Sequence, residues 1–104
     1  MRRFLTLMLP AIMFLAMSGC QKKSANPSMQ LAVGKAIFEQ NCVRCHGADG
    51  KQIPDWRSTV QKMTDQQVKN QIINGGGGMP AFKDQLTPQQ IDEVTAYTKH
   101  LASG

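Results

Sequence analysis

The 104-residue sequence has no apolar run long enough to cross a membrane as a helix. Its main apolar run covers residues 4–17 and contains Pro10, whereas a spanning helix needs about 18 or more apolar residues. Aromatic residues make up only 6% of the chain, and no segment alternates apolar and polar residues as a half-buried strand would. The length allows one domain, which excludes a two-domain enzyme with its own nucleotide-binding fold.

A concentrated basic surface is also missing. The formal net charge is +5, but four of the 12 basic side chains precede residue 29: Arg2, Arg3, Lys22 and Lys23. From residue 29 onward, eight basic side chains face seven acidic ones, which leaves a charge of +1. A nucleic-acid-binding face needs clustered basic side chains, so we expect no nucleic-acid partner.

The first 28 residues have the pattern of an export signal followed by a linker. A basic start, the apolar run and small residues before Cys20 predict that residues 1–19 are a secretory signal peptide. The four residues that end at Cys20 resemble a bacterial lipobox, which predicts cleavage before this cysteine and its lipidation. Residues 20–28 are then the lipidated cysteine and a flexible linker. The alternative is an uncleaved N-terminal anchor helix.

The remaining segment, residues 29–104, is predicted to be one small all-α domain with three main helices. Helical periodicity is present at residues 29–41, 64–74 and 87–101. Thr64 with Gln67 and Thr87 with Gln90 predict a capping box at the start of the second and third helices. Residues 47–63 and 75–86 are turn-rich. A domain below about 70–80 residues usually needs a staple or a cofactor to complete its core.

The spacing of cysteine and histidine indicates which cofactor this is. Cys42 and Cys45 lie three apart, and His46 follows at once. In an exported chain such a pair could form a disulfide or a redox dithiol, or half of a zinc site, but a second pair of zinc ligands is missing. The following histidine favours covalent attachment of one c-type haem, with both sulfurs on one side of a helix end and His46 on the iron.

A second axial ligand is expected at Met79. It follows four glycines, which allow close approach of backbone to a ligand, and precedes Pro80, which stiffens the turn. Met29 and Met63 are expected to pack in the core instead. Ligation by His46 and Met79 fills both axial positions and raises the reduction potential, so the iron is left to carry electrons.

With these motifs, residues 34–101 resemble a small monohaem class I cytochrome c of bacteria. The resemblance rests on Cys42-x-x-Cys45-His46, on Met79-Pro80 and on a further set: Gly34, Phe38, Pro54 and Tyr97. It implies an all-α fold in which the first and last helices cross near Gly34, Phe38 and Tyr97.

The resemblance also implies roles for three residues beside the haem. The carbonyl of Pro54 would accept the Nδ1 hydrogen of His46, and Trp56 and Arg57 would contact the haem propionates. The sequence departs from some relatives because no obvious asparagine lies near Met79, so the hydrogen bonding around the sulfur is unassigned.

The predicted function is a membrane-tethered carrier of single electrons between respiratory redox proteins, and not an enzyme. Its donor and acceptor are expected to be redox proteins, in particular membrane complexes, with no small-molecule substrate. The protein is expected on the periplasmic or outer side of a bacterial membrane, with the outer membrane of a Gram-negative cell as one option. Contact with partners is expected at the haem edge, near Val43, Arg44, Ala81 and Phe82.

Two alternatives to the carrier remain open at this point. One is a haem-containing accessory subunit of an oxidase or reductase. The other is a peroxidase-like haem enzyme, which requires that Met79 is not bound to the iron.

Overall fold

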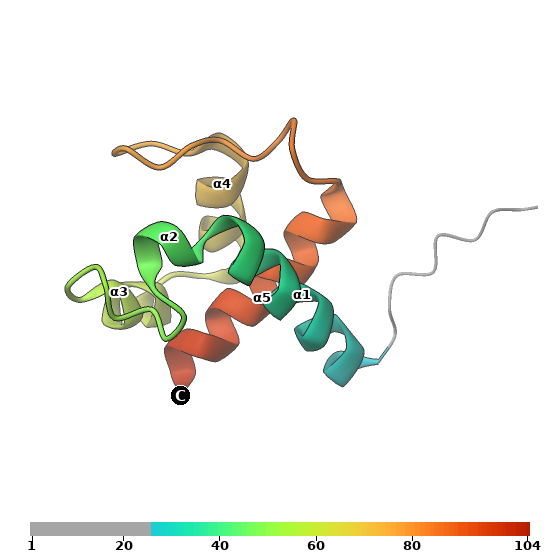
Figure 1. Cartoon of the computed structure of the whole chain (residues 1–104), viewed down its shortest axis with the longest axis horizontal. Coiled ribbons are helices and arrows are strands. Elements are labelled where there is room, and N and C mark those ends of the chain that lie inside the picture. Colours follow the sequence, from blue (N-terminus) through green and yellow to red (C-terminus); the bar gives the residue numbers. More distant parts are fainter. Residues whose placement is uncertain (1–25) are drawn as a thin grey trace, which may run out of the picture.

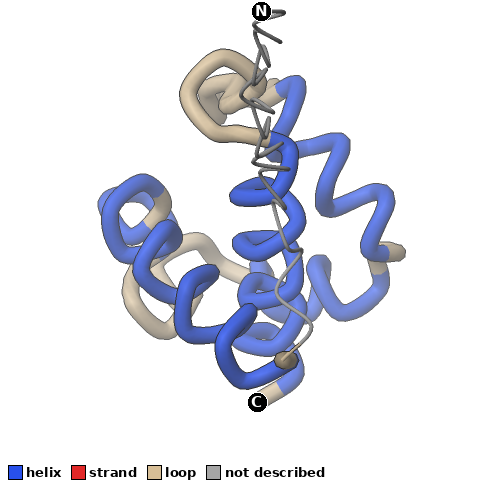
Figure 2. Tube along the Cα trace, turned by 90° about the vertical axis from the view of Figure 1, so that its right-hand side faces the viewer, coloured by secondary structure: helices blue, strands red, loops and turns tan. Residues whose placement is uncertain are grey.

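The computed structural model describes residues 26–104 as an arrangement of five helices. In chain order they are α1 (Pro27–Asn41), α2 (Val43–His46), α3 (Trp56–Lys62), α4 (Asp65–Asn74) and α5 (Pro88–Ser103). Within the described residues there is no β-strand, only one isolated antiparallel bridge between Gly76 and Met79 (Figure 2). The predicted all-α class is therefore confirmed. The signal segment and Cys20 lie outside the described residues.

The first and last helices cross at the place that the resemblance implied (Figure 1). A Cβ atom on Gly34 would lie 2.2 Å from the carbonyl oxygen of Glu93 and 2.8 Å from Cβ of Tyr97, so only glycine fits here. One turn further, the Phe38 and Tyr97 rings meet edge to face with their centroids 5.4 Å apart. The close approach of α1 and α5 forms the centre of the fold.

Both predicted capping boxes are present. The Thr64 side chain accepts a hydrogen bond from the Gln67 amide, and the Gln67 side chain accepts one from the Thr64 amide. Thr87 and Gln90 form the same reciprocal pair at the start of α5, where Pro88 occupies the first turn. Helix α4 ends at Asn74 before Gly75, as the sequence predicted.

The helices differ from the sequence-based expectation at the start of α1, within the segment 47–63, and at the end of α5, which runs to Ser103 and not only to residue 101. Helix α1 begins at Pro27, two residues before its predicted start at Met29 and within the predicted linker. It begins there because the Asn26 side chain accepts a hydrogen bond from the Ser28 amide and caps the helix. The segment 47–63, expected to be turns, contains α3. This helix has no side-chain cap at its start, where Asp55 adopts a left-handed conformation.

The core is small. Among residues 26–104, nine apolar side chains are buried: Ile37, Phe38, Val60, Val68, Ile72, Phe82, Ile91, Val94 and Ala102. Around them lie ten apolar side chains that are only half-buried: Val33, Cys42, Val43, Trp56, Met63, Ile73, Met79, Leu86, Tyr97 and Leu101. A large apolar ligand against this second group would cover surface that the chain alone leaves partly exposed.

Candidate haem-binding site

Cys42, Cys45 and His46 lie where α1 passes into α2. Cys42 is the cap residue between the two helices, and its carbonyl accepts hydrogen bonds from the amides of Cys45 and His46 at 3.3 and 3.0 Å. The two cysteines are therefore one helical turn apart. Both thiols are free, with Cys42 half-buried and Cys45 exposed. This arrangement fits the attachment of two sulfurs to one edge of a porphyrin.

The raised pKa of the Cys42 thiol argues against a redox dithiol. Burial, and to a smaller extent the neighbouring Cys45, raises the pKa of the free Cys42 thiol to about 11. Reactive cysteines in redox pairs have depressed pKa values, because the thiolate is the nucleophile. At neutral pH Cys42 is instead a protonated, half-buried thiol. The dithiol alternative is accordingly disfavoured.

A zinc site finds no support in residues 26–104. Over this part of the chain, no group of three or more histidine, cysteine, aspartate or glutamate side chains could hold a metal ion. Structural zinc is normally bound by four such ligands. The alternative of half a zinc site is therefore disfavoured too.

His46 presents an imidazole held in the form that binds metals. Burial lowers its pKa below the usual value of a histidine, which favours the neutral ring over the imidazolium. Its Nδ1 atom is buried and has no hydrogen-bond partner. The ring lies against the indole of Trp56, with the centroids 5.1 Å apart and the planes tilted by 39°.

The hydrogen bond predicted between Pro54 and His46 is not formed in this structure. No acceptor lies within hydrogen-bond distance of Nδ1. Pro54 is exposed, in a turn that is closed by a hydrogen bond from the Trp56 amide to the Ile53 carbonyl. The ring that lies against the imidazole of His46 is that of Trp56.

Trp56 and Arg57 begin α3 but point to different surroundings. The Trp56 ring is half-buried and also lies near Phe38, with ring centroids 6.1 Å apart. Arg57 donates a hydrogen bond from Nη2 to the Leu101 carbonyl at 3.1 Å, so its guanidinium has a partner within the protein. A contact of either residue with a haem propionate stays a prediction.

Met79 stands at the end of a loop of unusual backbone conformation. Gly75, Gly76, Gly77 and Gly78 all have positive φ angles, which glycine adopts without strain. Gly76 and Met79 exchange two backbone hydrogen bonds of 2.9 and 3.1 Å. The half-buried Met79 side chain packs against the core, whereas Met29 is 55% exposed at the start of α1.

Gln71 is the residue near Met79 that the sequence did not reveal. Its Nε2 atom lies 3.9 Å from Sδ of Met79 and 3.4 Å from the carbonyl oxygen of Gly76. A glutamine on the exposed face of a helix carries no signal in the sequence, because its partner is fixed by the fold of the glycine loop. The donor that seemed to be missing near the sulfur is therefore an amide from α4.

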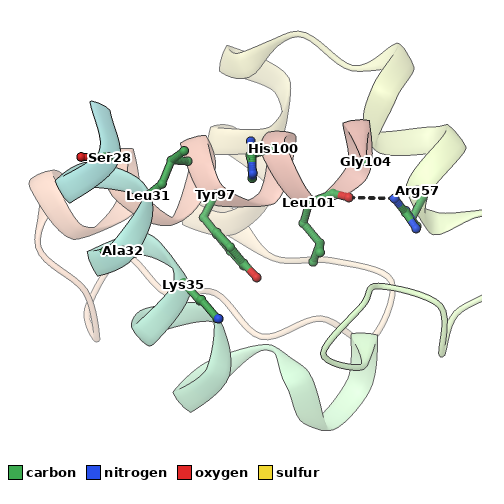
Figure 3. Close-up of a pocket in the computed structure, with 9 residues that line it drawn as sticks. All are labelled: Ser28, Leu31, Ala32, Lys35, Arg57, Tyr97, His100, Leu101 and Gly104. Atoms are coloured by element: carbon green, nitrogen blue, oxygen red, sulfur yellow. Dashed lines mark hydrogen bonds between the residues drawn. The ribbon is translucent and has the colours of Figure 1, made fainter. Parts of the chain in front are cut away.

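A shallow groove of about 620 Å³ lies between α1 and α5 (Figure 3). Arg57 is the one residue predicted to contact the haem that lines it; Cys42, Cys45, His46 and Met79 do not. No helix among residues 26–104 has the length and apolar character needed to cross a membrane.

Comparison with known proteins gives one consistent family. A family model described as cytochrome C oxidase, cbb3-type, subunit III matches residues 29–97. Cytochrome c6 of Chlorolobion braunii is 39% identical over 85 residues, covering 71% of this chain and 93% of that protein. The crystal structure of cytochrome c6 from the diatom Phaeodactylum tricornutum matches with a TM-score of 0.62 and 26% identity, over 70% of this chain and 94% of that one.

A longer relative shares only part of its length with the chain. The cbb3-type cytochrome c oxidase subunit FixP of Sinorhizobium medicae is 30% identical over 108 residues, which is 84% of this chain but 36% of FixP. The chain thus spans about a third of that subunit. On the family match, the full-length cytochrome c6 relatives and the helical fold, the chain belongs to the small single-haem class I cytochromes c, and it is an electron carrier with one covalently bound c-type haem, not an enzyme.

Proposed function

We propose that the protein is an exported, lipid-anchored cytochrome that passes single electrons between redox proteins. The observation that carries the proposal is that Cys42, Cys45 and His46 lie together at one helix end, while Met79 ends a loop of four glycines with positive φ angles. Cys42 and Cys45 would hold the haem through thioether bonds, and His46 and Met79 would take its two axial positions. When bound, the haem supplies an iron that changes reversibly between two oxidation states.

The side chains of the site serve this role by keeping the ligands in place during electron transfer. The neutral imidazole of His46 and the thioether of Met79 bind both oxidation states of iron, so no ligand has to leave. Gln71 offers a hydrogen bond to the Met79 sulfur. With both axial positions occupied, oxygen, peroxide or a substrate has no position at which to bind.

Carbon monoxide tests the proposed ligation. We expect the ferrous wild-type protein to show no spectral change with carbon monoxide, because Met79 blocks the site. The variant Met79→Ala should bind carbon monoxide at once. A wild-type protein that binds carbon monoxide readily at neutral pH would contradict Met79 ligation and support the peroxidase-like alternative.

The lipid anchor is proposed from Cys20 and the residues before it. Mass spectrometry of the mature protein should show cleavage before Cys20, diacylglycerol on its sulfur and one haem. With only residues 21–25 between Cys20 and the described domain, the haem would stay close to the membrane on its periplasmic or outer side. A mature protein that retains residues 1–19 would instead support the anchor-helix alternative.

The proposed partner surface is the haem edge, but one of the residues expected on this surface is not accessible. Val43 and Ala81 are half-buried and Arg44 is exposed, but Phe82 is only 5% exposed and packs in the core. We therefore propose Val43, Arg44 and Ala81 as contacts. Arg44→Glu should slow electron transfer to the natural partner, whereas Lys62→Glu on α3 should not. Equal rates for the wild type and both variants would exclude Arg44 as a contact residue.

A role as an oxidase subunit is the second candidate, favoured by the family model that matches residues 29–97. A subunit stays with its complex during purification, whereas a carrier dissociates. Mild detergent extraction followed by size-exclusion chromatography with detection of the haem absorbance separates the two. Co-elution with a terminal oxidase at physiological salt would favour the subunit.

A further inference from the structure

Helix α3 is a short helix with little stability of its own. It has seven residues, no side-chain cap at its start and no acidic residue in its first turn. Isolated helices of this length are not stable in water, so its position has to come from tertiary contacts. Of its residues only Val60 is buried.

Three side chains that cross between α3 and α5 supply these contacts. From α3, Arg57 donates to the Leu101 carbonyl at 3.1 Å (Figure 3) and Gln61 donates to the Ala102 carbonyl. From α5, Lys99 donates to the carbonyls of α3 residue Val60, at 3.1 Å, and of Met63, the residue that ends it. We call Arg57, Gln61 and Lys99 the α3–α5 clamp. These side chains thereby add hydrogen bonds to carbonyls near the C-terminal ends of both helices.

The clamp fixes the first residue of α3, which is Trp56. The indole also lies against Gly50, where an added Cβ would lie 2.3 Å from Cζ3 of the ring. Phe38 lies on another side, with ring centroids 6.1 Å apart. Trp56 is therefore held between the clamp, the turn at Gly50 and the core.

The imidazole of His46 is the group against which this indole rests. The ring torsion of a histidine is intrinsically soft, and a hydrogen bond at Nδ1 normally fixes it in metal-binding histidines. Here Nδ1 has no partner, and the ring centroids of His46 and Trp56 are 5.1 Å apart. The packing of the Trp56 indole against the imidazole is the contact that the structure shows for orienting the ring.

We infer that Trp56 is the positioning residue of the axial histidine, and that the α3–α5 clamp sets the orientation of the imidazole on the iron through Trp56. The inference rests on the proposed ligation by His46. It adds a route by which residues at the ends of two helices, with no contact to His46, influence the ligand geometry of the iron.

The test uses the mature, full-length oxidised protein and a readout of ligand orientation. The g-values in electron paramagnetic resonance and the hyperfine-shifted haem methyl resonances both respond to the orientation of the axial imidazole. We expect Trp56→Leu to shift both, and Trp56→Phe, which retains a ring, to restore most of the wild-type pattern. Lys99→Met should shift them in the same direction by a smaller amount.

His100→Gln is the matched control for Lys99→Met. His100 is the next residue on α5, it is exposed, and its side chain forms no hydrogen bond to α3. We expect its spectra to equal those of the wild type. If Trp56→Leu is not matured, Lys99→Met and Gln61→Ala still test the inference, because neither residue lies against His46.

Stability measured in denaturant separates positioning from a purely structural role. Variants that lose stability while their g-values and methyl shifts stay unchanged in buffer would overturn the inference, as would a Trp56→Phe protein that behaves like Trp56→Leu. A wild-type spectrum without the low-spin signature of His/Met ligation would overturn the proposed function together with this inference. A normal wild-type spectrum with unresponsive variants overturns this inference alone.

Discussion

The side-chain amide of Gln71 lies 3.9 Å from the sulfur of Met79, eight residues further along the chain. A donor at the sulfur withdraws electron density from it, and the ferric iron loses more by this than the ferrous iron. Hydrogen bonds near the metal are among the means by which a protein tunes a reduction potential. Helix α4 thus contributes to the redox properties of the site although it carries none of the proposed ligands.

Replacing Gln71 by leucine is expected to lower the reduction potential. A hydrogen bond contributes about 0.5–1.5 kcal/mol, and about 1.4 kcal/mol corresponds to roughly 59 mV for one electron. We therefore expect a decrease of about 20–60 mV in a spectroelectrochemical titration. Gln66→Leu is the matched control, because Gln66 on the same helix bonds only to Asn70. An unchanged potential in Gln71→Leu would show that the contact does not act on the sulfur.

The crossing of α1 and α5 should not tolerate any side chain at residue 34. In Gly34→Ala the new methyl group would meet the Glu93 carbonyl at 2.2 Å, so the helices have to move apart. Overpacking of this kind costs about 1–3 kcal/mol. Denaturant unfolding followed by helical circular dichroism should show that loss, while Gln40→Ala, at an exposed residue of α1, should change stability by less than about 0.5 kcal/mol. Equal stabilities would refute the close approach.

The helices that could be predicted from the sequence are those whose first residues are capped by residues close to them in the sequence. The reciprocal hydrogen bonds of Thr64 with Gln67 and of Thr87 with Gln90 involve residues three apart, and both were found where predicted. Helix α3 was missed because its ends are satisfied by residues about 40 positions away, such as Lys99 and Leu101. A local pattern carries no information about such contacts.

The same distinction applies to the site. Cys42, Cys45 and His46 lie close together in the sequence, and the fold keeps them within about one helical turn. Which residues contact these three side chains depends on how the turns of the chain close. The structure accordingly shows no hydrogen bond at Nδ1 of His46 where one from Pro54 was expected, and the contact of Gln71 with Met79 was not foreseen.

The Met79 loop is expected to open before the protein unfolds. Gly76, Gly77 and Gly78 are exposed, and two hydrogen bonds between Gly76 and Met79 close the turn. Each glycine loses about 0.4–1 kcal/mol more entropy on ordering than alanine would. In a denaturant titration, the absorption band of the bond between the Met79 sulfur and the haem iron should disappear first. The helical circular dichroism should be lost only at a higher denaturant concentration. Coincident transitions would contradict early opening and show one cooperative unit.

Two glycines of this loop have similar φ angles but different surroundings. Gly75 and Gly77 have φ angles of 66° and 62°. A Cβ at residue 75 would lie 2.5 Å from the Met79 carbonyl oxygen and 2.7 Å from Pro80, whereas at residue 77 it would meet nothing within 4 Å. Gly75 also has a ψ angle of −158°, which together with its positive φ angle is a conformation that essentially only glycine adopts. Gly75→Ala therefore meets backbone strain and crowding together, whereas Gly77→Ala meets no crowding.

We expect Gly75→Ala to displace Met79 and Gly77→Ala to leave it in place. Gly75→Ala should lose the iron–sulfur absorption band in buffer and bind carbon monoxide in the ferrous state. Gly77→Ala should keep the band and lose only about 1 kcal/mol of stability. If both variants keep the band, residue 75 does not hold Met79 on the iron. If both lose it, backbone strain alone opens the loop, and the crowding at Gly75 has no separate effect.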